Sequence, residues 1–414
     1  MLRKAIYLHS KLFKKMNRVY SITTLFFILA YAAFTLSGCS FPARKHAVPQ
    51  ASTEKAEIVG LPGVRYEVDT EMPAFTQDMI ESFYREQRFL TDQVQNGQLP
   101  PANFLAISGG GDNGAFGAGL LCGWTSAGNR PEFKAVTGIS TGALIAPFAF
   151  LGPEYDSILR EVYTTISPKD VLKERGILAA VFEDAMADNA PLRRLIQHYI
   201  TKDILQEISR QHERGRLLLI MTTNLDARKS VIWNMGKIAA SGHPEALQLF
   251  HNIMLASAAI PVAFPPVMFD VEVNGKQYQE MHVDGGTMKQ VFLYPPALRA
   301  RAISEQGGVF REKNLYLIRN ARLDPDWAEV ERRTYSIAAR AITSLIQTQG
   351  IGDLYQIYAE TQRDGIDYNL AYIPKSFNAP HKEDFDTEYM KKLFQTGYDL
   401  AVDGYQWEKA PPGL

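Results

Sequence analysis

A G-x-S-x-G motif, which runs from Gly138 through Ser140 to Gly142, constrains the fold of this chain more than any other feature. An apolar run at 135–139 precedes it and an apolar stretch at 142–150 follows it. A strand, a tight turn and a helix in that order place the serine on an elbow at the end of a sheet, where flanking glycines make room for packing. The motif therefore predicts an α/β fold with Ser140 as a nucleophile. The alternative is a serine that caps the N-terminus of a helix.

The rest of the chain from residue 103 onward alternates short apolar runs with helical segments. Strands are expected at 104–108, 135–139, 217–221 and 315–319, and helices at 115–127, 142–150, 335–349, 388–402 and from Asn189 onward. Asn274-Gly275 between two further apolar runs predicts a β-hairpin. This alternation is typical of an α/β domain with a mostly parallel central sheet.

A glycine-rich loop follows the first expected strand of this domain. Gly109, Gly110 and Gly111 are consecutive, and Gly114 opens the next helix. Backbone N–H groups in such a loop can approach an anion closely, and the helix N-terminus adds partial positive charge. The same glycines fit a dinucleotide-binding pattern, but that pattern requires an acidic residue at the end of the next strand, whereas Glu132 precedes that strand.

A third motif, Asp284-Gly285-Gly286, ends the expected strand that contains His282. By itself an Asp-Gly pair indicates only a turn. Its significance comes from the other two motifs.

The glycine loop, the G-x-S-x-G motif and the D-G-G motif, in this order, resemble those of the patatin-like phospholipases. The resemblance covers roughly residues 103–286 and includes the segments 256–261 and 264–267. It implies a three-layer α/β/α sandwich in which Ser140 attacks an acyl ester and Asp284 accepts its proton, without a catalytic histidine. The resemblance also implies that the N–H groups of Gly109 to Gly111 hold the oxyanion. It implies neither a metal nor an organic cofactor.

The resemblance implies a lipid acyl hydrolase of the phospholipase A, lysophospholipase or esterase type, with membrane phospholipid or another acyl ester as substrate. Thioester hydrolysis or acyl transfer would use the same residues. Two positions depart from the family pattern. Asn113 stands where a basic residue is usual, and Ser108 stands where Asp or Gly is usual.

Two other functions remain open at this stage. An α/β-hydrolase could use Ser140, Asp284 and His381 as a triad, although the His-Gly-Gly signature of that fold is missing. A catalytically inert envelope lipoprotein could use the same scaffold to bind lipid or a partner.

The N-terminus has the layout of a bacterial export signal. Six basic and no acidic residues occur in 1–38, the stretch 19–43 is uncharged, and Leu36-Ser37-Gly38-Cys39 resembles a lipobox. We expect cleavage before Cys39, lipid on its thiol, and location in the cell envelope. Ser40 follows the cysteine at the position where, by resemblance to the Gram-negative lipoprotein sorting rule, Asp would retain the protein in the inner membrane, so we expect the outer membrane. The alternative is a single membrane-spanning anchor.

Five regions are expected along the chain. They are a signal peptide at 1–38, a tether at 39–63, a helical extension at 64–102, a catalytic core at 103–300, and a C-terminal part of the same domain at 301–414.

Without the six basic residues of the signal, 38 basic groups face 45 acidic ones, which argues against nucleic-acid binding. The second cysteine, Cys122, is expected to be buried.

Overall fold

The computed structural model describes residues 44–68, 73–90, 99–174, 185–306, 311–325, 327 and 329–414. Apart from Arg44, all of them belong to one compact unit. The expected signal peptide at 1–38 and Cys39 lie outside the described residues. Within the described ranges, no helix has the length and apolar character needed to cross a membrane.

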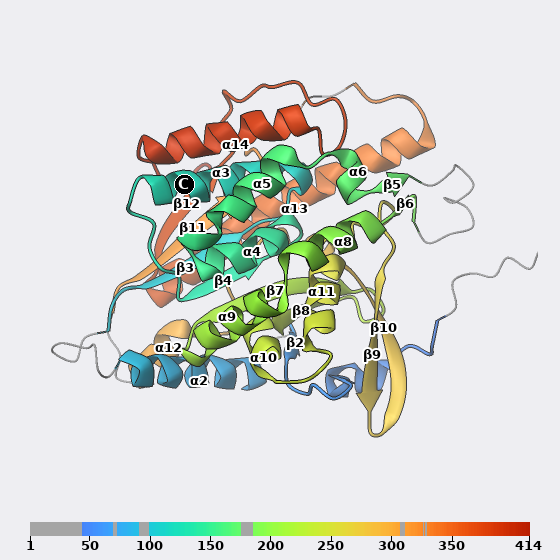
Figure 1. Cartoon of the computed structure of the whole chain (residues 1–414), viewed down its shortest axis with the longest axis vertical. Coiled ribbons are helices and arrows are strands. Elements are labelled where there is room, and N and C mark those ends of the chain that lie inside the picture. The colour runs from blue at the N-terminus through green and yellow to red at the C-terminus, as the bar shows by residue number, and fades with distance from the viewer. Residues whose placement is uncertain are drawn as a thin grey trace, which may run out of the picture. The chain divides into compact units, whose positions relative to one another are not determined.

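The centre of the main sheet is parallel, as the sequence predicts (Figure 1). Its five neighbouring strands, in spatial order, are β7 (Leu217–Asn224), β4 (Ala135–Gly138), β3 (Ala102–Ile107), β11 (Lys313–Arg319) and β12 (Asp367–Tyr372). β11 pairs directly with β3, so strands from the expected catalytic core and from the expected C-terminal part share one sheet.

Beyond β7 the sheet becomes antiparallel, which the sequence indicated only through its hairpin. The expected hairpin around Asn274-Gly275 is present. The antiparallel strands are β9 (Val267–Val273), β10 (Lys276–Asp284), β8 (Lys229–Asn234), β2 (Arg65–Glu67) and β1 (Glu57–Ile58). A separate two-stranded sheet joins β5 (Lys173–Glu174) and β6 (Ala187–Asp188).

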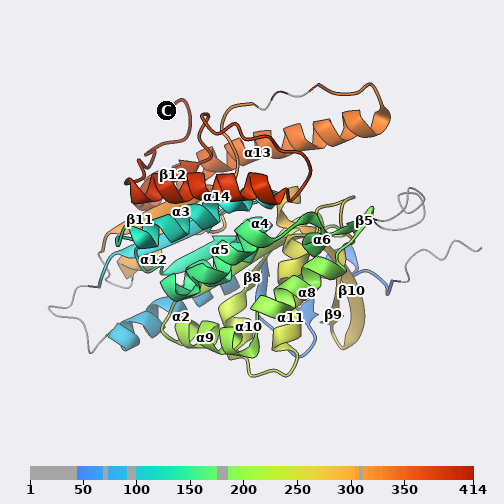
Figure 2. The same cartoon turned by 45° about the horizontal axis from the view of Figure 1, so that its top comes forward.

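Helices cover both faces of the sheet, which confirms the expected α/β/α layers (Figures 1 and 2). One face carries α3 (Gly114–Ser126), α4 (Thr141–Leu151), α5 (Asp156–Thr165), α8 (Ala190–Tyr199), α9 (Lys202–Glu213), α10 (Met235–Ala240), α11 (Ala246–Ser257) and α14 (Thr387–Val402). The other face carries α2 (Pro73–Leu90), α12 (Ala300–Gln306) and α13 (Thr334–Asp364). Short elements are α6 (Pro168–Val171), η1 (Gln50–Lys55), η3 (Gly111–Asn113), η4 (Pro153–Tyr155) and η5 (Gly285–Thr287).

The two cores follow from the alternation of side chains along each buried strand. In β3, Leu105 and Ile107 pack into one core and Ala106 packs into the other. Cys122 is free and buried in the first core, as expected.

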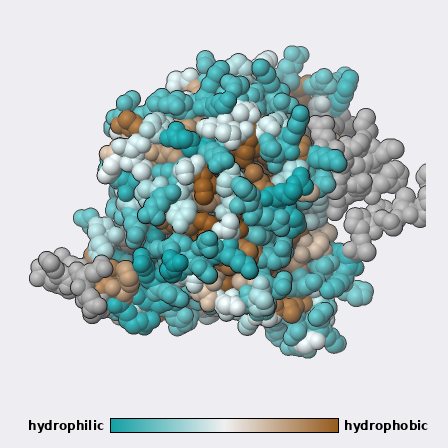
Figure 3. Space-filling view, in the orientation of Figure 1, coloured by the Kyte–Doolittle hydropathy of each residue, from teal (hydrophilic) through white to brown (hydrophobic). Residues whose placement is uncertain are grey.

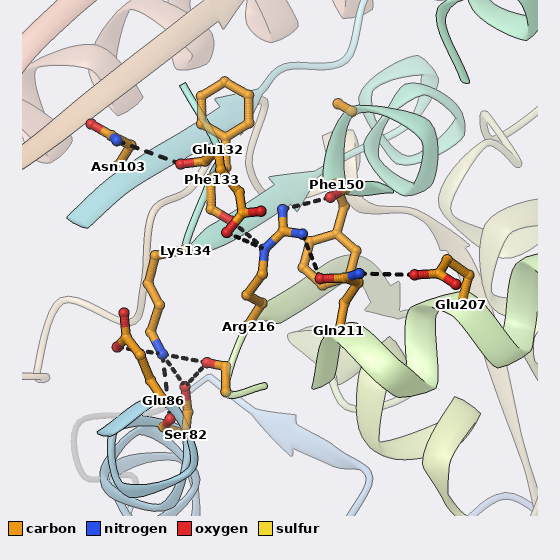
Figure 4. Close-up of polar contacts among 12 residues, drawn as sticks. Ser82, Glu86, Asn103, Glu132, Phe133, Lys134, Phe150, Glu207, Gln211 and Arg216 are labelled. Carbon is orange, nitrogen blue, oxygen red and sulfur yellow. Dashed lines mark hydrogen bonds and ion pairs between the residues drawn. The ribbon is translucent and has the colours of Figure 1, made fainter. Parts of the chain in front are cut away.

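Polar side chains fix the start of β4, as Figure 4 shows. Lys134 precedes the strand, and its ammonium group lies 2.9 Å from the carboxylate of Glu86 and 3.0 Å from the hydroxyl of Ser82. Arg216 donates to the carbonyl of Phe133 at 2.8 Å. The start of the strand that leads to Ser140 is therefore held from two sides.

The described part of the expected tether differs from a free linker. β1 pairs with β9, and Lys45 lies 3.0 Å from the carboxylate of Asp270. Ala56, Ile58 and Leu61 are buried. These apolar side chains are spaced too irregularly to predict an element, yet they bury enough surface to fix the segment against the sheet.

Candidate active site

Ser140 lies on a strained elbow between β4 and α4. Its backbone has φ 56° and ψ −124°, a left-handed conformation that a residue other than glycine adopts only when its surroundings enforce it. The N–H of Ser140 donates to the hydroxyl of Ser257 at 3.0 Å, and that hydroxyl donates to the carbonyl of Met221 at 2.8 Å. The Ser140 side chain forms no hydrogen bond to the helix N-terminus, which argues against a capping role.

The two motif glycines allow the chain to pass closely at this elbow. A Cβ atom on Gly138 would lie 2.4 Å from the carbonyl oxygen of Gly142. One on Gly142 would lie 2.2 Å from the carbonyl oxygen of Ile107. No side chain fits at either position without moving the backbone.

Sheet pairing brings Ser140 and Asp284 together although 144 positions separate them in the sequence. β4 pairs with the first half of β7, up to Ile220, and β10 pairs with the second half, where Asp284 lies opposite Thr222. β8 occupies the other edge of β7. The carboxyl ends of β4 and β10 therefore meet on one edge of the same strand.

Asp284 is a buried carboxyl group with few partners. Its Oδ1 accepts a hydrogen bond from the N–H of Gly286 at 2.7 Å. Burial raises its pKa from 3.8 to about 7, whereas the nearby Ser140 hydroxyl and the Gly286 N–H act to lower it. Its other oxygen, Oδ2, is buried and has no hydrogen-bond partner among the described residues.

Gln290 links the Asp284 turn to the glycine loop, and the sequence did not indicate this residue. The side-chain amide of Gln290 donates to the backbone carbonyl of Gly286 at 2.7 Å. The backbone carbonyl of Gln290 accepts from the N–H of Gly109 at 3.0 Å. Gly285 packs so closely on β7 that a Cβ would lie 2.6 Å from the carbonyl oxygen of Met221.

The glycine loop lies beside Ser140. A Cβ on Gly109 would be 3.2 Å from the Cβ of Ser140. The N–H of Gly109, expected to be an oxyanion donor, already donates to Gln290. The N–H groups of Gly110 and Gly111 have no acceptor in the part of the chain that the structure describes, so these two are the available donors.

Four residues hold this loop, of which two were marked only as departures from the family pattern and two were not singled out by the sequence. Asn320, at the end of β11, donates from its side chain to the carbonyl of Ser108 at 2.9 Å. Its N–H donates to the Ser108 hydroxyl at 2.8 Å. The side-chain oxygen of Asn113 accepts from the Tyr389 hydroxyl at 2.6 Å. Gly114 allows the start of α3 to pack on Thr141, whose Oγ1 would lie 2.2 Å from an added Cβ.

A mainly apolar cavity of about 50 Å³ opens beside Ser140 and Gly111. The remaining lining comes chiefly from α4, α5, α8 and the segment after α11, and includes Leu144, Val162, Ile166, Leu195, Phe264 and Phe385. In Figure 3, apolar side chains gather over α4 in the middle of a mostly hydrophilic face. An apolar pocket beside a serine suits the hydrocarbon part of an ester.

Among the described residues, no histidine hydrogen-bonds to Asp284, so none completes a triad with Ser140. Nε2 of His381 pairs with the carboxylate of Asp112 at 2.7 Å. His282 is fully buried and bonds to Thr222 and Glu280 through its two ring nitrogens. In the described ranges, no cluster of three or more His, Cys, Asp or Glu side chains could hold a metal ion.

Residues 105–296 match the family model described as patatin-like phospholipase, and this range contains all three motifs. The matched range is just under half of the chain. No curated protein matches the sequence.

Three solved structures share weak overall similarity with this chain. VipD from Legionella pneumophila has 11% identity and a TM-score of 0.33, with 75% of this chain and 68% of that chain covered. Human GIVD cytosolic phospholipase A2 has 10% identity and a TM-score of 0.33, with 75% and 55% covered. A chain from the complex of SpcU with ExoU of Pseudomonas aeruginosa has 12% identity and a TM-score of 0.31, with 74% and 52% covered. This chain spans little more than half the length of the last two.

Proposed function

We propose that this protein is a lipid acyl hydrolase in which Ser140 is the nucleophile and Asp284 is the base. The observation that carries the proposal is the elbow serine facing a buried carboxyl group whose pKa is raised to about 7. A base with a pKa near neutrality can both take and return a proton at physiological pH. The patatin-like phospholipase domain at 105–296 supports the same chemistry.

The reaction has two stages. Oγ of Ser140 attacks the ester carbonyl while its proton passes to Asp284, and the N–H groups of Gly110 and Gly111 stabilise the oxyanion. Collapse of this intermediate releases the alcohol, which takes the proton from Asp284. Water then attacks the acyl-enzyme with Asp284 as base, which frees the fatty acid and restores Ser140.

We propose a membrane lipid or a related acyl ester as substrate, of the phospholipase A, lysophospholipase or esterase type. The apolar lining of the cavity supports an acyl chain as the bound group. We further propose that lipid on Cys39 anchors the protein in the bacterial envelope, with the outer membrane as its destination, which would bring the site close to such lipids.

The inert-scaffold alternative is less well supported than hydrolysis. Asn113 and Ser108, the two departures from the family pattern, both take part in hydrogen bonds that hold the glycine loop. A protein that only bound lipid would have no use for a strained serine beside a buried carboxyl group.

Hydrolysis of p-nitrophenyl esters and of phospholipid vesicles by the purified protein tests the proposal. Ser140→Ala and Asp284→Asn should each lower kcat by about 10³-fold or more. The exposed Ser344 provides a matched control, and Ser344→Ala should leave kcat unchanged. His381→Ala separates the mechanisms, because a triad requires a loss of about 10³ to 10⁴ whereas a Ser and Asp pair requires no more than about tenfold.

A further inference from the structure

The carboxylate of Asp112, next to the proposed oxyanion donors, is held from a distant part of the chain. Its Oδ2 accepts hydrogen bonds from Nε2 of His381 at 2.7 Å and from the N–H of Phe385 at 2.9 Å. Asp112 is only 8% exposed. Two donors on one buried carboxylate oxygen form a specific contact, since a charge-assisted bond is stronger than a neutral one.

A second contact joins the same two regions. The Tyr389 hydroxyl donates to the side-chain oxygen of Asn113 at 2.6 Å. The centroids of the Tyr389 and His381 rings are 4.3 Å apart. Phe385 has φ 62° and lines the cavity with Ser140. A strained residue at the cavity wall links the same segment to the site.

The support beneath these contacts is rigid. Tyr389 lies in the first turn of α14, which Asp386 caps by accepting from the N–H of Glu388 at 2.9 Å. α14 packs so closely on α3 that a Cβ on Gly119 would lie 1.9 Å from the carbonyl oxygen of Phe394. Helices in such contact cannot shift without unpacking.

We propose that His381, the N–H of Phe385 and the Tyr389 hydroxyl form a clamp that holds the glycine loop at Asp112 and Asn113. The clamp keeps the N–H groups of the neighbouring glycines directed toward Ser140. His381 and Tyr389 are thus positioning residues. This inference rests on the proposed function for its effect on rate, but its effect on the loop can be measured independently.

The clamp is also sensitive to pH. The groups that face His381 are the carboxylates of Asp112, Asp384 and Asp386 and the ring of Tyr389. The hydrogen bond to Asp112 raises the pKa of His381, burial opposes this, and the charges of the three carboxylates raise it further. Since the folded pKa is raised, protonated His381 strengthens the clamp at low pH, and this contribution is lost as pH rises through the folded pKa.

Two variants and a matched control test the clamp. His381→Gln removes the charge, and Tyr389→Phe removes one hydroxyl. Tyr398→Phe makes the same change on the same helix, where the hydroxyl contacts Ser126 instead. We would measure kcat and KM with a water-soluble short-chain ester, the melting temperature, and deuterium exchange at the amides of Asn113 and Gly114 at pH 6.

The clamp predicts at least threefold faster exchange at these two amides in His381→Gln and Tyr389→Phe, with no change in the control. It also predicts a fall in kcat of about tenfold at unchanged KM. His381→Arg, which keeps a charged donor at all pH values, should restore kcat and abolish the decline of the wild-type rate at alkaline pH. If His381 and Tyr389 only stabilised the fold, their replacement would alter neither the pH profile of the rate nor kcat at constant KM.

Exchange that stays at wild-type rates in both variants would overturn the clamp, whatever the activity. Faster exchange with wild-type kcat would overturn the positioning role. Faster exchange in a protein whose wild type cleaves no ester would support the clamp and contradict the proposed hydrolase function.

Discussion

Replacing the buried carboxyl of Asp284 should make the protein more stable at alkaline pH while abolishing activity. A carboxyl whose pKa rises from 3.8 to about 7 on folding stays protonated in the native state where the unfolded chain has released its proton. Stability therefore falls as pH rises between these two values, and the accumulated loss above pH 7 is about 4 kcal/mol. Asp284→Asn keeps the oxygen that accepts from Gly286 and removes the titration.

Urea unfolding at pH 4.5 and pH 8.5, followed by circular dichroism, measures this effect. Relative to wild type, the free energy of unfolding of Asp284→Asn should rise by several kcal/mol more at pH 8.5 than at pH 4.5. Asp270→Asn, at an exposed position on β9, should show no such difference. If the effect of Asp284→Asn were the same at both pH values, or reversed, the carboxyl would not be destabilised by burial and its role as a base with raised pKa would fail.

Three further outcomes follow from contacts in the structure. On the acid side of the pH-rate profile, kcat/KM should reach half of its maximum near pH 7, because Asp284 must lose its proton to act as a base. A midpoint near pH 4 would contradict this. Gly110→Ala should abolish activity and lower the melting temperature, because the added Cβ would lie 2.2 Å from the carbonyl oxygen of Asn320. Gly128 lies in open space, so Gly128→Ala should lower the free energy of unfolding, measured by chemical denaturation, by only about 1 kcal/mol. Glu86→Gln should lower the free energy of unfolding by about 3 kcal/mol or more with kcat unchanged, because it leaves the buried side chains of Lys134 and Arg311 without their shared counter-charge. A free energy of unfolding within about 1 kcal/mol of wild type would show that these two ion pairs contribute little.

The sequence predicted the elements whose signals are local. The G-x-S-x-G elbow, the parallel strands around it and the Asn274-Gly275 hairpin each depend on a few consecutive residues. β12 was missed because its sequence, DYNLAY, has too few apolar residues to indicate a buried strand. In the structure, it pairs with β11 along one edge. β1 and β2 were missed because two and three residues carry no periodicity.

The residues that hold the site come from far along the chain, and no local pattern could assign them. Ser257 contacts Ser140 across 117 positions, Asn320 contacts Ser108 across 212, and Tyr389 contacts Asn113 across 276. Each is an ordinary polar residue beside the end of a helix or strand. Only the sheet order and the close contact of α14 with α3 bring them to the loop.

Covalent labelling tests the central claim, that Ser140 is a nucleophile activated by Asp284, most directly. The purified protein would be incubated with a long-chain fluorophosphonate, digested, and analysed by mass spectrometry. We predict a single phosphonyl adduct on Ser140 in wild type, at least 100-fold slower labelling in Asp284→Asn, and no adduct in Ser140→Ala. Label at another residue, or a wild type that hydrolyses esters without labelling at Ser140, would contradict the account.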